Sequence, residues 1–294
     1  ADGDWSSDVC SSDLLRGGQH KANPLWRSPC CVHDVATAGV PGQIHLPEWG
    51  GPEMSADLLE VQELEKSFDG IRALADFSCS IGQGEILGLI GPNGAGKTTL
   101  LNVISRFLTP ESGRAMFQGK SLLGLPPHEI AMTGIARTFQ NLRLIRQVSV
   151  LDNVLLSFRH QPGERLSNVF FRWKNSKEQE AANREEALGL LDEAGLSEKA
   201  NDPAEDLSYG QQKLLSLVCC LAAKGDLLLL DEPVAGIAPE MIDKIVGIIR
   251  DLPSKGKSVI LIEHNLDAVM QVCGRVIFMD AGAKISEGTP DEVR

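Results

Sequence analysis

The sequence predicts an α/β fold in which a mostly parallel core sheet carries an antiparallel β flank and an inserted helical subdomain. Three patterns support this prediction. A strand-length apolar run at 84–90 enters a glycine-rich loop and then a helical pattern, a second apolar run at 226–233 contains two acids at its end, and the segment 148–206 between them has helical spacing. The 294 residues, 43% of them hydrophobic, suffice for one large α/β domain or two smaller ones.

The composition excludes several classes of function. A formal net charge of -12 and an aromatic content of 5% leave no basic excess for binding nucleic acid, so we expect no nucleic-acid partner. No apolar run approaches the roughly 18 residues of a membrane span, so any membrane role is expected to act through a partner. The seven cysteines include no C-x-x-C pair, which argues against zinc or a disulfide framework and favours reduced thiols in the cytosol.

Residues 1–53 lack the apolar period of a helix or a strand, unlike the rest of the chain. The string DWSSDVCSSDL at 4–14 also resembles the translation of a common sequencing adapter, and Met54 begins a well-patterned stretch. We therefore interpret 1–53 as an unstructured, non-native leader and place the folded domain at 54–294. A genuine disordered extension is the alternative.

Two runs at 58–64 and 73–81 open the domain and predict an antiparallel sheet beside its core. The next run, GEILGLI at 84–90, leads into GPNGAGKTT at 91–99, which fits the phosphate-loop pattern G-x-x-x-x-G-K-[ST]. In this pattern, backbone N–H groups and a helix N-terminus bind phosphate, the lysine reaches the β- and γ-phosphates, and the threonine hydroxyl binds Mg²⁺. The predicted nucleotide-binding residues of the loop are Gly91, Asn93, Gly94, Gly96, Lys97, Thr98 and Thr99.

Between 148 and 206 the sequence shows cap residues, early acids and apolar residues at helical spacing, which predicts the inserted helical subdomain. The core is then divided into 54–147 and 207–294. One basic and aromatic patch, FFRWKNSK at 170–177, has the composition of a nucleic-acid or membrane-surface site. A single short patch on an acidic chain instead favours an exposed loop between helices.

The run DLLLLDEP at 226–233 has the continuous apolar character of a parallel strand buried on both faces, and it leads into Asp231 and Glu232. In a doubly wound sheet, ligands bind beyond the carboxyl ends of the strands, so these carboxylates and the phosphate loop should face one crevice. We predict that Asp231 holds Mg²⁺, directly or through water. Glu232 is then placed to accept a proton from, or to orient, the water that attacks the γ-phosphate. The alternative for an isolated acidic pair is a solvated turn.

These motifs, in this order and spacing, resemble an ATP-binding cassette, and the resemblance covers 57–294. Besides the phosphate loop and LLLLDE, it includes Phe68, Gln140 in RTFQN, the signature LSYGQ at 207–211 and His264 in LIEHN. The resemblance implies that Phe68 stacks on adenine, that Gln140 approaches Mg²⁺ and water while sensing a partner, and that His264 contacts the γ-phosphate. Without it, a core phenylalanine, a surface amide and a polar residue at a helix start are the simpler interpretations.

Cassettes of this family act as head-to-tail pairs, in which the signature of one subunit closes over ATP held by the phosphate loop of the other. LSYGQ precedes an apolar-periodic helix, so it sets backbone N–H groups at a helix start and forms a second anion site. The resemblance therefore implies that a second cassette, the same or a related chain, is a partner. The signature residues that would act on its ATP are Ser208, Tyr209, Gly210 and Gln211.

The sequence departs from the family pattern at two informative places. Ala238 in AGIAP replaces the usual Asp or Asn, which would remove a polar link across the dimer. Tyr209 replaces the commoner glycine of the signature. That variant, together with the run GIARTFQNLRL at 134–144, is familiar in cassettes that serve branched-chain amino acid importers.

The resemblance implies the ATP-hydrolysing subunit of an importer, with ATP and Mg²⁺ as cofactors. Such a subunit drives separate membrane permease subunits, lies through them on the cytoplasmic face of the membrane, and meets a solute-binding protein only indirectly. Branched-chain amino acids or related small polar solutes are the expected cargo. One alternative is a non-transport ABC ATPase acting on another macromolecular partner, although neither fused cassettes nor a long coiled coil is visible. Another is a simple phosphate-loop kinase, which explains neither LSYGQ nor His264.

Overall fold

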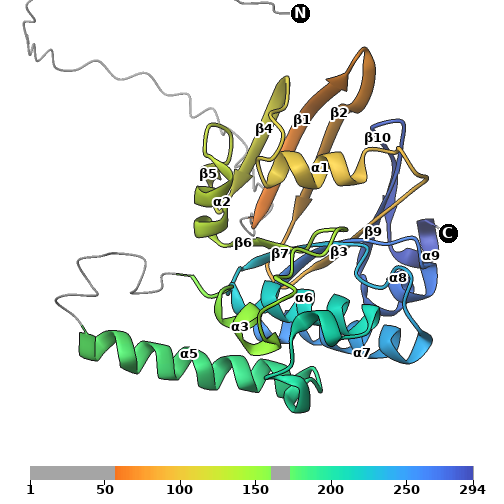
Figure 1. Cartoon of the computed structure of the whole chain (residues 1–294). Coiled ribbons are helices and arrows are strands. Elements are labelled where there is room, and N and C mark those ends of the chain that lie inside the picture. Colours follow the sequence, from red (N-terminus) through yellow and green to blue (C-terminus); the bar gives the residue numbers. More distant parts are fainter. Residues whose placement is uncertain (1–56, 160–172, 294) are drawn as a thin grey trace, which may run out of the picture. The chain divides into compact units, whose positions relative to one another are not determined.

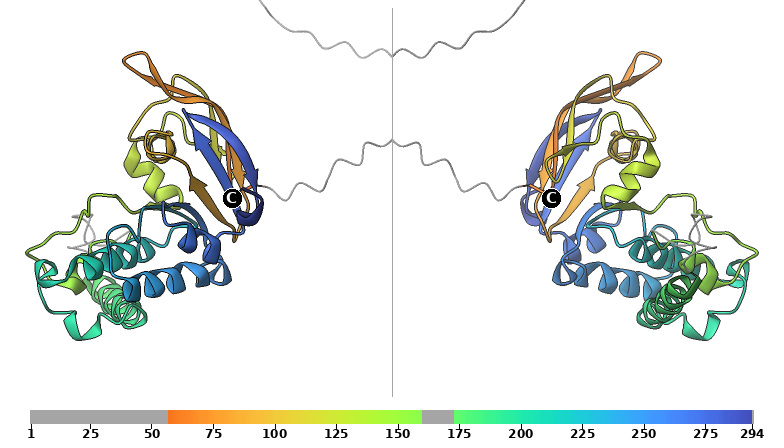
Figure 2. Two further views of the ribbon diagram at one scale, coloured as in Figure 1. Left: turned by 90° about the vertical axis from the view of Figure 1, so that its right-hand side faces the viewer. Right: turned by 90° about the vertical axis from the view of Figure 1, so that its left-hand side faces the viewer.

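The structure, a computed structural model, describes residues 57–159 and 173–293. The leader expected at 1–53 lies outside the described residues. Two sheets organise the described part of the chain: one has six strands in the order β10-β9-β3-β8-β7-β6, and the other has four in the order β2-β1-β4-β5. Figures 1 and 2 show the four-stranded sheet and α1 on one side of the six-stranded sheet, with α5, α6 and α7 on the other.

The six-stranded sheet is parallel from β9 to β6, and β10 pairs with β9 in the antiparallel sense at one edge. This arrangement confirms the predicted mostly parallel core. The strands of this sheet are β3 (Ile86–Ile90), β6 (Ile135–Arg137), β7 (Leu227–Asp231), β8 (Ser258–Ile262), β9 (Arg275–Asp280) and β10 (Ala283–Gly288).

The register of three neighbouring strands places the functional loops at one level. Strand β8 lies between β3 and β7, and its Ile262 pairs with both Leu89 and Asp231. Because the three strands run in the same direction, the loops that follow them leave the sheet together. The phosphate loop follows β3, Glu232 follows β7, and His264 follows β8. The topology thus gathers segments that are far apart in the sequence.

The central strands β7 and β8 are buried along their whole length, as their continuous apolar sequences require. Successive side chains of a strand point to opposite faces of the sheet. Leu228 and Leu230 therefore pack into a hydrophobic cluster with the helices on one face, and Leu227 and Leu229 pack into a second cluster with α1 and the four-stranded sheet. Both faces of the sheet belong to the core.

The four-stranded sheet is the antiparallel flank that the sequence predicts. Its first two strands form a hairpin in which Phe68 pairs with Ile71. The two residues between them, Asp69 and Gly70, have φ values of 48° and 85°, which are the left-handed values of a tight type I′ turn. The strands of this sheet are β1 (Leu59–Phe68), β2 (Ile71–Ile81), β4 (Ser112–Phe117) and β5 (Lys120–Ser121).

Helices α3 and α5 occupy the segment for which the sequence predicts an insertion, but α6, from the second core segment, packs against both of them. The subdomain boundaries 148–206 therefore stay a proposal. None of the described helices is both long and apolar enough to cross a membrane. The helices are α1 (Lys97–Ile104), α2 (Pro127–Thr133), α3 (Val150–Leu155), α5 (Trp173–Glu193), α6 (Tyr209–Ala222), α7 (Pro239–Asp251), α8 (Leu266–Val272) and α9 (Pro290–Val293), with 3₁₀ turns η2 (Ser197–Lys199), η3 (Ala204–Asp206) and η4 (Pro253–Lys255).

The prediction of an exposed loop at 170–177 is wrong for residues 173–177, which the structure describes. Helix α5 already begins at Trp173, and residues 170–172 lie outside the described residues. The physical reason is that the segment after Trp173 is rich in lysine, glutamate and glutamine, which are good helix formers and extend the helical pattern toward the N-terminus.

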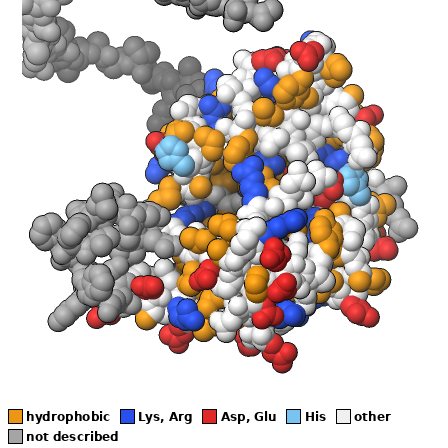
Figure 3. Space-filling model, viewed as in Figure 1, with side chains coloured by type: hydrophobic (Ala, Val, Ile, Leu, Met, Phe, Trp, Pro, Cys, Tyr) orange, Lys and Arg blue, Asp and Glu red, His pale blue; other side chains and the backbone are white. Residues whose placement is uncertain are grey.

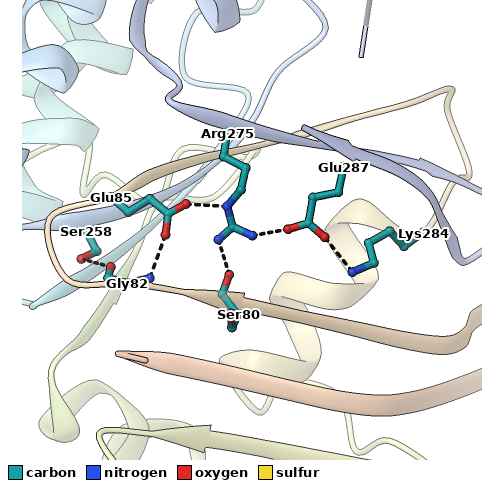
Figure 4. A network of polar contacts seen from close by, with 7 residues as sticks. All are labelled: Ser80, Gly82, Glu85, Ser258, Arg275, Lys284 and Glu287. Atoms are coloured by element: carbon teal, nitrogen blue, oxygen red, sulfur yellow. Dashed lines mark hydrogen bonds and ion pairs between the residues drawn. The ribbon is translucent and has the colours of Figure 1, made fainter. Parts of the chain in front are cut away.

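A polar network joins the antiparallel strands to the core (Figure 4). Arg275 of β9 donates from Nε to Glu85 at 2.7 Å, from Nη2 to the Ser80 carbonyl of β2 at 2.6 Å, and from Nη1 to Glu287 of β10. Lys284 also donates to Glu287, at 2.7 Å. The hydrogen bond to Glu85 raises the pKa of Arg275. Burial alone would raise the pKa of Glu287, but its bonds with Lys284 and Arg275 lower it overall.

We expect Arg275→Met to lower the free energy of unfolding by roughly 1.5–3 kcal/mol, because Glu85 and Glu287 lose a charged donor. At roughly 2–4 °C per kcal/mol, the thermal midpoint should fall by several degrees at neutral pH. Since the folded pKa of Glu287 is lowered, its contribution is present above the unfolded pKa and is lost as the pH falls through the folded pKa. The difference from the wild type should therefore shrink in acid.

Thermal unfolding followed by circular dichroism over a descending pH series measures both effects. Arg250→Met is the control, because Arg250 donates a single exposed hydrogen bond to Gln271. Equal midpoints for Arg275→Met and Arg250→Met at neutral pH would contradict the structural role of the network.

Candidate active site

The glycine-rich loop joins β3 to α1, and its shape excludes side chains at two positions. Gly91 and Gly96 have φ values of 144° and 97°. A Cβ at Gly91 would lie 2.0 Å from the Met279 carbonyl oxygen, and one at Gly96 would lie 2.2 Å from that of Ala73. Only glycine fits such close backbone approaches. Lys97 then begins α1, whose first N–H groups have no partner within the helix and are available to an anion.

Lys97 is folded back on its own loop. Its Nζ donates to the carbonyl oxygens of Gly91 at 2.8 Å and Pro92 at 2.9 Å. Burial lowers the pKa of Lys97, and the nearby carboxylates of Glu232 and Asp231 oppose that shift. The ammonium group therefore adds positive charge to the same loop whose N–H groups are available to an anion.

Asp231, at the end of β7, connects the acidic strand to the phosphate loop. Its Oδ1 accepts a hydrogen bond from Thr98 Oγ1 at 3.4 Å, and its Oδ2 lies 3.3 Å from Arg137 Nη2. Burial raises the pKa of Asp231, while the Arg137 guanidinium opposes the shift. A hydroxyl and a carboxylate this close are oxygen ligands suited to Mg²⁺, which takes its other ligands from phosphates and water. No trio of His, Cys, Asp or Glu within 57–159 and 173–293 could hold a metal ion.

Glu232 has a left-handed backbone with φ of 51°, which is uncommon outside glycine. Its N–H donates to the Ile262 carbonyl at 2.9 Å, and its own carbonyl accepts a hydrogen bond from Lys213 Nζ at 2.7 Å. The side chain lies between two other predicted residues: Gln140 Nε2 donates to Oε2 at 3.3 Å, and His264 Nε2 lies 3.2 Å from Oε1. Both the backbone and the carboxylate of Glu232 are therefore held.

The phosphate loop and the Glu232 group enclose a cavity of about 230 Å³. A cavity of about 480 Å³ lies elsewhere, and one of about 330 Å³ adjoins the site through Gly91 and His264, but neither is lined by Lys97 or Glu232. We place the proposed nucleotide site in the 230 Å³ cavity because the anion donors of the phosphate loop meet a candidate base there. The residues that line it are Asn93, Gly94, Ala95, Gly96, Lys97, Thr98, Thr99, Gln140, Glu232 and His264.

The cavity of about 480 Å³ has a different chemistry. It is lined by apolar side chains together with Arg137, Arg143 and Arg159. On the face shown in Figure 3, Lys and Arg side chains gather with hydrophobic ones near the middle, whereas many Asp and Glu side chains lie lower on that face. Charge is thus unevenly distributed over this face.

Gly91 and Asp231 adjoin the 230 Å³ cavity without lining it, and Phe68 and the signature do not line it either. Phe68, at the end of β1, is 42% exposed and has Lys66 Nζ 5.3 Å from its ring, so its role in adenine stacking stays a prediction. The signature lies at the start of α6. There Ser208 Oγ accepts a hydrogen bond from the Gln211 N–H at 3.3 Å, while Gln211 Oε1 accepts one from the Ser208 N–H at 3.0 Å. This capping box fixes the helix start, and Tyr209 beside it is 51% exposed.

Two further positions of the signature region have clear packing constraints. A Cβ at Gly210 would lie 3.1 Å from Met241, so α6 and α7 approach closely there. Ala238 is the N-cap residue of α7 and makes no side-chain cap hydrogen bond. The replacement of the family's usual Asp or Asn therefore leaves this helix without a polar cap at its N-terminus.

Sequence patterns do not predict two buried cations of the site, Lys213 and Arg137. Besides its contact with Asp231, Arg137 Nη1 donates to Asn102 at 2.8 Å and to Ser105 at 2.7 Å. Its Nε is the one buried side-chain polar atom without a partner among the described residues. In the sequence, Arg137 stands three positions before Gln140, and Lys213 stands near the start of an apolar helix. Neither position reveals that the side chain is buried.

Known proteins resemble the chain in sequence. The ABC transporter family model matches residues 74–235. BraF of Pseudomonas aeruginosa, a high-affinity branched-chain amino acid transport ATP-binding protein, is 34% identical over 242 residues, which cover 82% of this chain and 95% of that protein. This chain belongs to the ABC transporter family. Within that family it is an ATP-binding cassette, and its enzymatic activity is that of an ATPase.

Solved ABC cassettes confirm the fold class. The crystal structure of the ADP conformation of one cassette has a TM-score of 0.69 and 34% identity, and the match covers 80% of this chain and 92% of that one. A dimeric structure of a post-hydrolysis cassette bound to ADP and Pi has a TM-score of 0.66 and 26% identity, with coverage of 79% and 98%. The match to solved cassettes over about four fifths of the chain shows that the fold is that of an ABC cassette.

Proposed function

We propose that this chain is the ATP-hydrolysing subunit of an importer and drives separate membrane permease subunits. The observation that carries the proposal is the arrangement around one cavity of the phosphate loop, the paired Thr98 and Asp231, and Glu232 held between Gln140 and His264. Branched-chain amino acids or related small polar solutes are the proposed cargo, because relatives such as BraF are branched-chain amino acid transport proteins.

In the proposed reaction the phosphate loop and Lys97 hold the β- and γ-phosphates of ATP. Thr98 and Asp231 would hold Mg²⁺, which neutralises phosphate charge when bound. Glu232 orients the attacking water and accepts its proton, and its fixed backbone keeps the carboxylate in place. His264, beside that carboxylate, contacts the γ-phosphate.

The proposed site is completed by a second cassette, the same or a related chain, arranged head to tail. Two observations support this part: the signature does not line the cavity of its own chain, and a dimeric cassette is among the structural relatives. The capped start of α6 offers fixed N–H groups to the nucleotide of the partner. Permease subunits would hold the pair on the cytoplasmic face of the membrane, and a solute-binding protein would act only through them.

Glu232→Gln tests the assigned base. Removing a positioned proton acceptor should slow hydrolysis by about 10²- to 10⁴-fold and leave ATP and Mg²⁺ binding nearly intact. The variant should therefore accumulate as an ATP-loaded dimer, which gel filtration with ATP would detect. Hydrolysis at the wild-type rate in the presence of the permease partners would show that Glu232 does not have this role.

Ser208→Arg tests the composite site. The bulky charge should block closure over the partner's γ-phosphate and abolish hydrolysis, while the ATP affinity of dilute monomer stays unchanged. Lys97→Ala should behave oppositely and weaken monomer binding by roughly ten- to a hundredfold, since it removes a charge-assisted contact worth about 1.5–3 kcal/mol.

Ser254→Arg, on the exposed turn η4, is the control for the added charge. Nucleotide binding at concentrations below dimerisation and hydrolysis above it separate the two effects. Loss of monomer ATP binding in Ser208→Arg alone would mean that the signature acts within its own chain.

A further inference from the structure

Lys213 is a buried cation with an unusual set of partners. It lies in α6, one turn after Tyr209, and is only 5% exposed. Its Nζ donates to the Glu232 carbonyl at 2.7 Å and lies 5.8 Å from the centre of the Tyr209 ring. No carboxylate among the described residues comes within 4.0 Å of it. Burying an ammonium group without a carboxylate is unfavourable, so stability alone does not explain this lysine.

The group that Lys213 holds is the backbone of the proposed catalytic residue. Glu232 has a left-handed φ of 51°, a conformation that needs support from its surroundings in a non-glycine residue. Its N–H is fixed by the Ile262 carbonyl of β8, and its carbonyl is fixed by Lys213. The second contact comes from a helix rather than from the sheet, so the orientation of this peptide depends on where α6 lies.

The same helix carries the signature at its start. The capping box makes the first turn of α6 rigid, and Tyr209 and Lys213 share one helix face because they are four residues apart. A shift of the first turn would therefore move the Lys213 side chain, and with it the carbonyl of Glu232.

We propose that Lys213 is a positioning residue that holds the Glu232 backbone and ties the catalytic carboxylate to the signature end of α6 in the same chain. The inference rests on the proposed function, in which Glu232 acts on water and the signature meets the ATP of a second cassette. Each chain then carries a direct link between the nucleotide of its partner and the base of its own site. When the signature of a chain binds the nucleotide of its partner, α6 is fixed in position. Lys213 then holds Glu232, the proposed base, in the chain's own site.

The test compares steady-state hydrolysis and ATP binding in full-length variants. Lys213→Met keeps the side-chain length but removes the donor, so kcat should fall by about 10- to 100-fold, the loss expected when a reacting group is misplaced by about 1 Å. KM and the ATP dissociation constant of the monomer should stay within about twofold of the wild type, because no phosphate contact is removed. Lys213→Arg retains a charged donor and should restore most of kcat.

Lys255→Met is the matched control. Lys255 makes an equally short contact, 2.7 Å to Glu193, but is half exposed and belongs to the turn η4. It should leave kcat unchanged. If Lys213→Met does not fold, Lys213→Gln replaces it, since its shorter amide cannot keep the contact with the carbonyl.

A double-mutant cycle with Glu232→Gln, measured by single-turnover hydrolysis, separates positioning from general damage. If Lys213 acts through Glu232, adding Lys213→Met to Glu232→Gln should cause little further loss. A wild-type kcat in Lys213→Met overturns this inference. So does a loss of hydrolysis rate from Lys213→Met that is equally large in the wild type and in Glu232→Gln. If Glu232→Gln itself hydrolyses ATP normally, the proposed function fails instead, so the two failures are distinguishable.

Discussion

The proposed active site depends on the parallel alignment of β3, β8 and β7. Ile262 of β8 pairs with Leu89 on one side and with Asp231 on the other, so the three strands end at a common level. The phosphate loop, Glu232 and His264 leave the sheet immediately beyond that level. Burial of β7 and β8 on both faces fixes this register, because a slip of one residue would exchange the two hydrophobic clusters.

On this framework, polar neighbours hold the charged groups of the site in place. Thr98 and Arg137 each contact one carboxylate oxygen of Asp231, and Lys97 donates hydrogen bonds to carbonyls of its own loop. Gln140 and His264 flank the Glu232 carboxylate. These contacts preorganise the site before a nucleotide binds, which is how electrostatic catalysis avoids reorganisation during the reaction. The signature stands apart from this group, and Lys213 links the two.

The sequence predicts those parts of the fold that local patterns determine. Continuous apolar runs predict the buried strands, and the glycine spacing predicts the phosphate loop, whose Gly91 and Gly96 cannot carry side chains. The burial of Arg137 and Lys213 could not be predicted, because it depends on groups distant in sequence: Arg137 contacts Asp231 across 94 positions. The start of α5 differs from the prediction for a local reason. The basic and aromatic composition of 170–177 suggests a surface loop, but the helix propensity of the residues after Trp173 prevails.

In the proposed pair of cassettes, each chain supplies only half of each of two active sites. This sharing can be measured as specific ATPase activity over a dilution series, with sedimentation of the same samples. If the site is shared, activity per chain should rise with protein concentration and level off when dimers saturate, because two chains must meet for each hydrolysis. Constant activity per chain at concentrations where sedimentation finds only monomers would contradict the shared site.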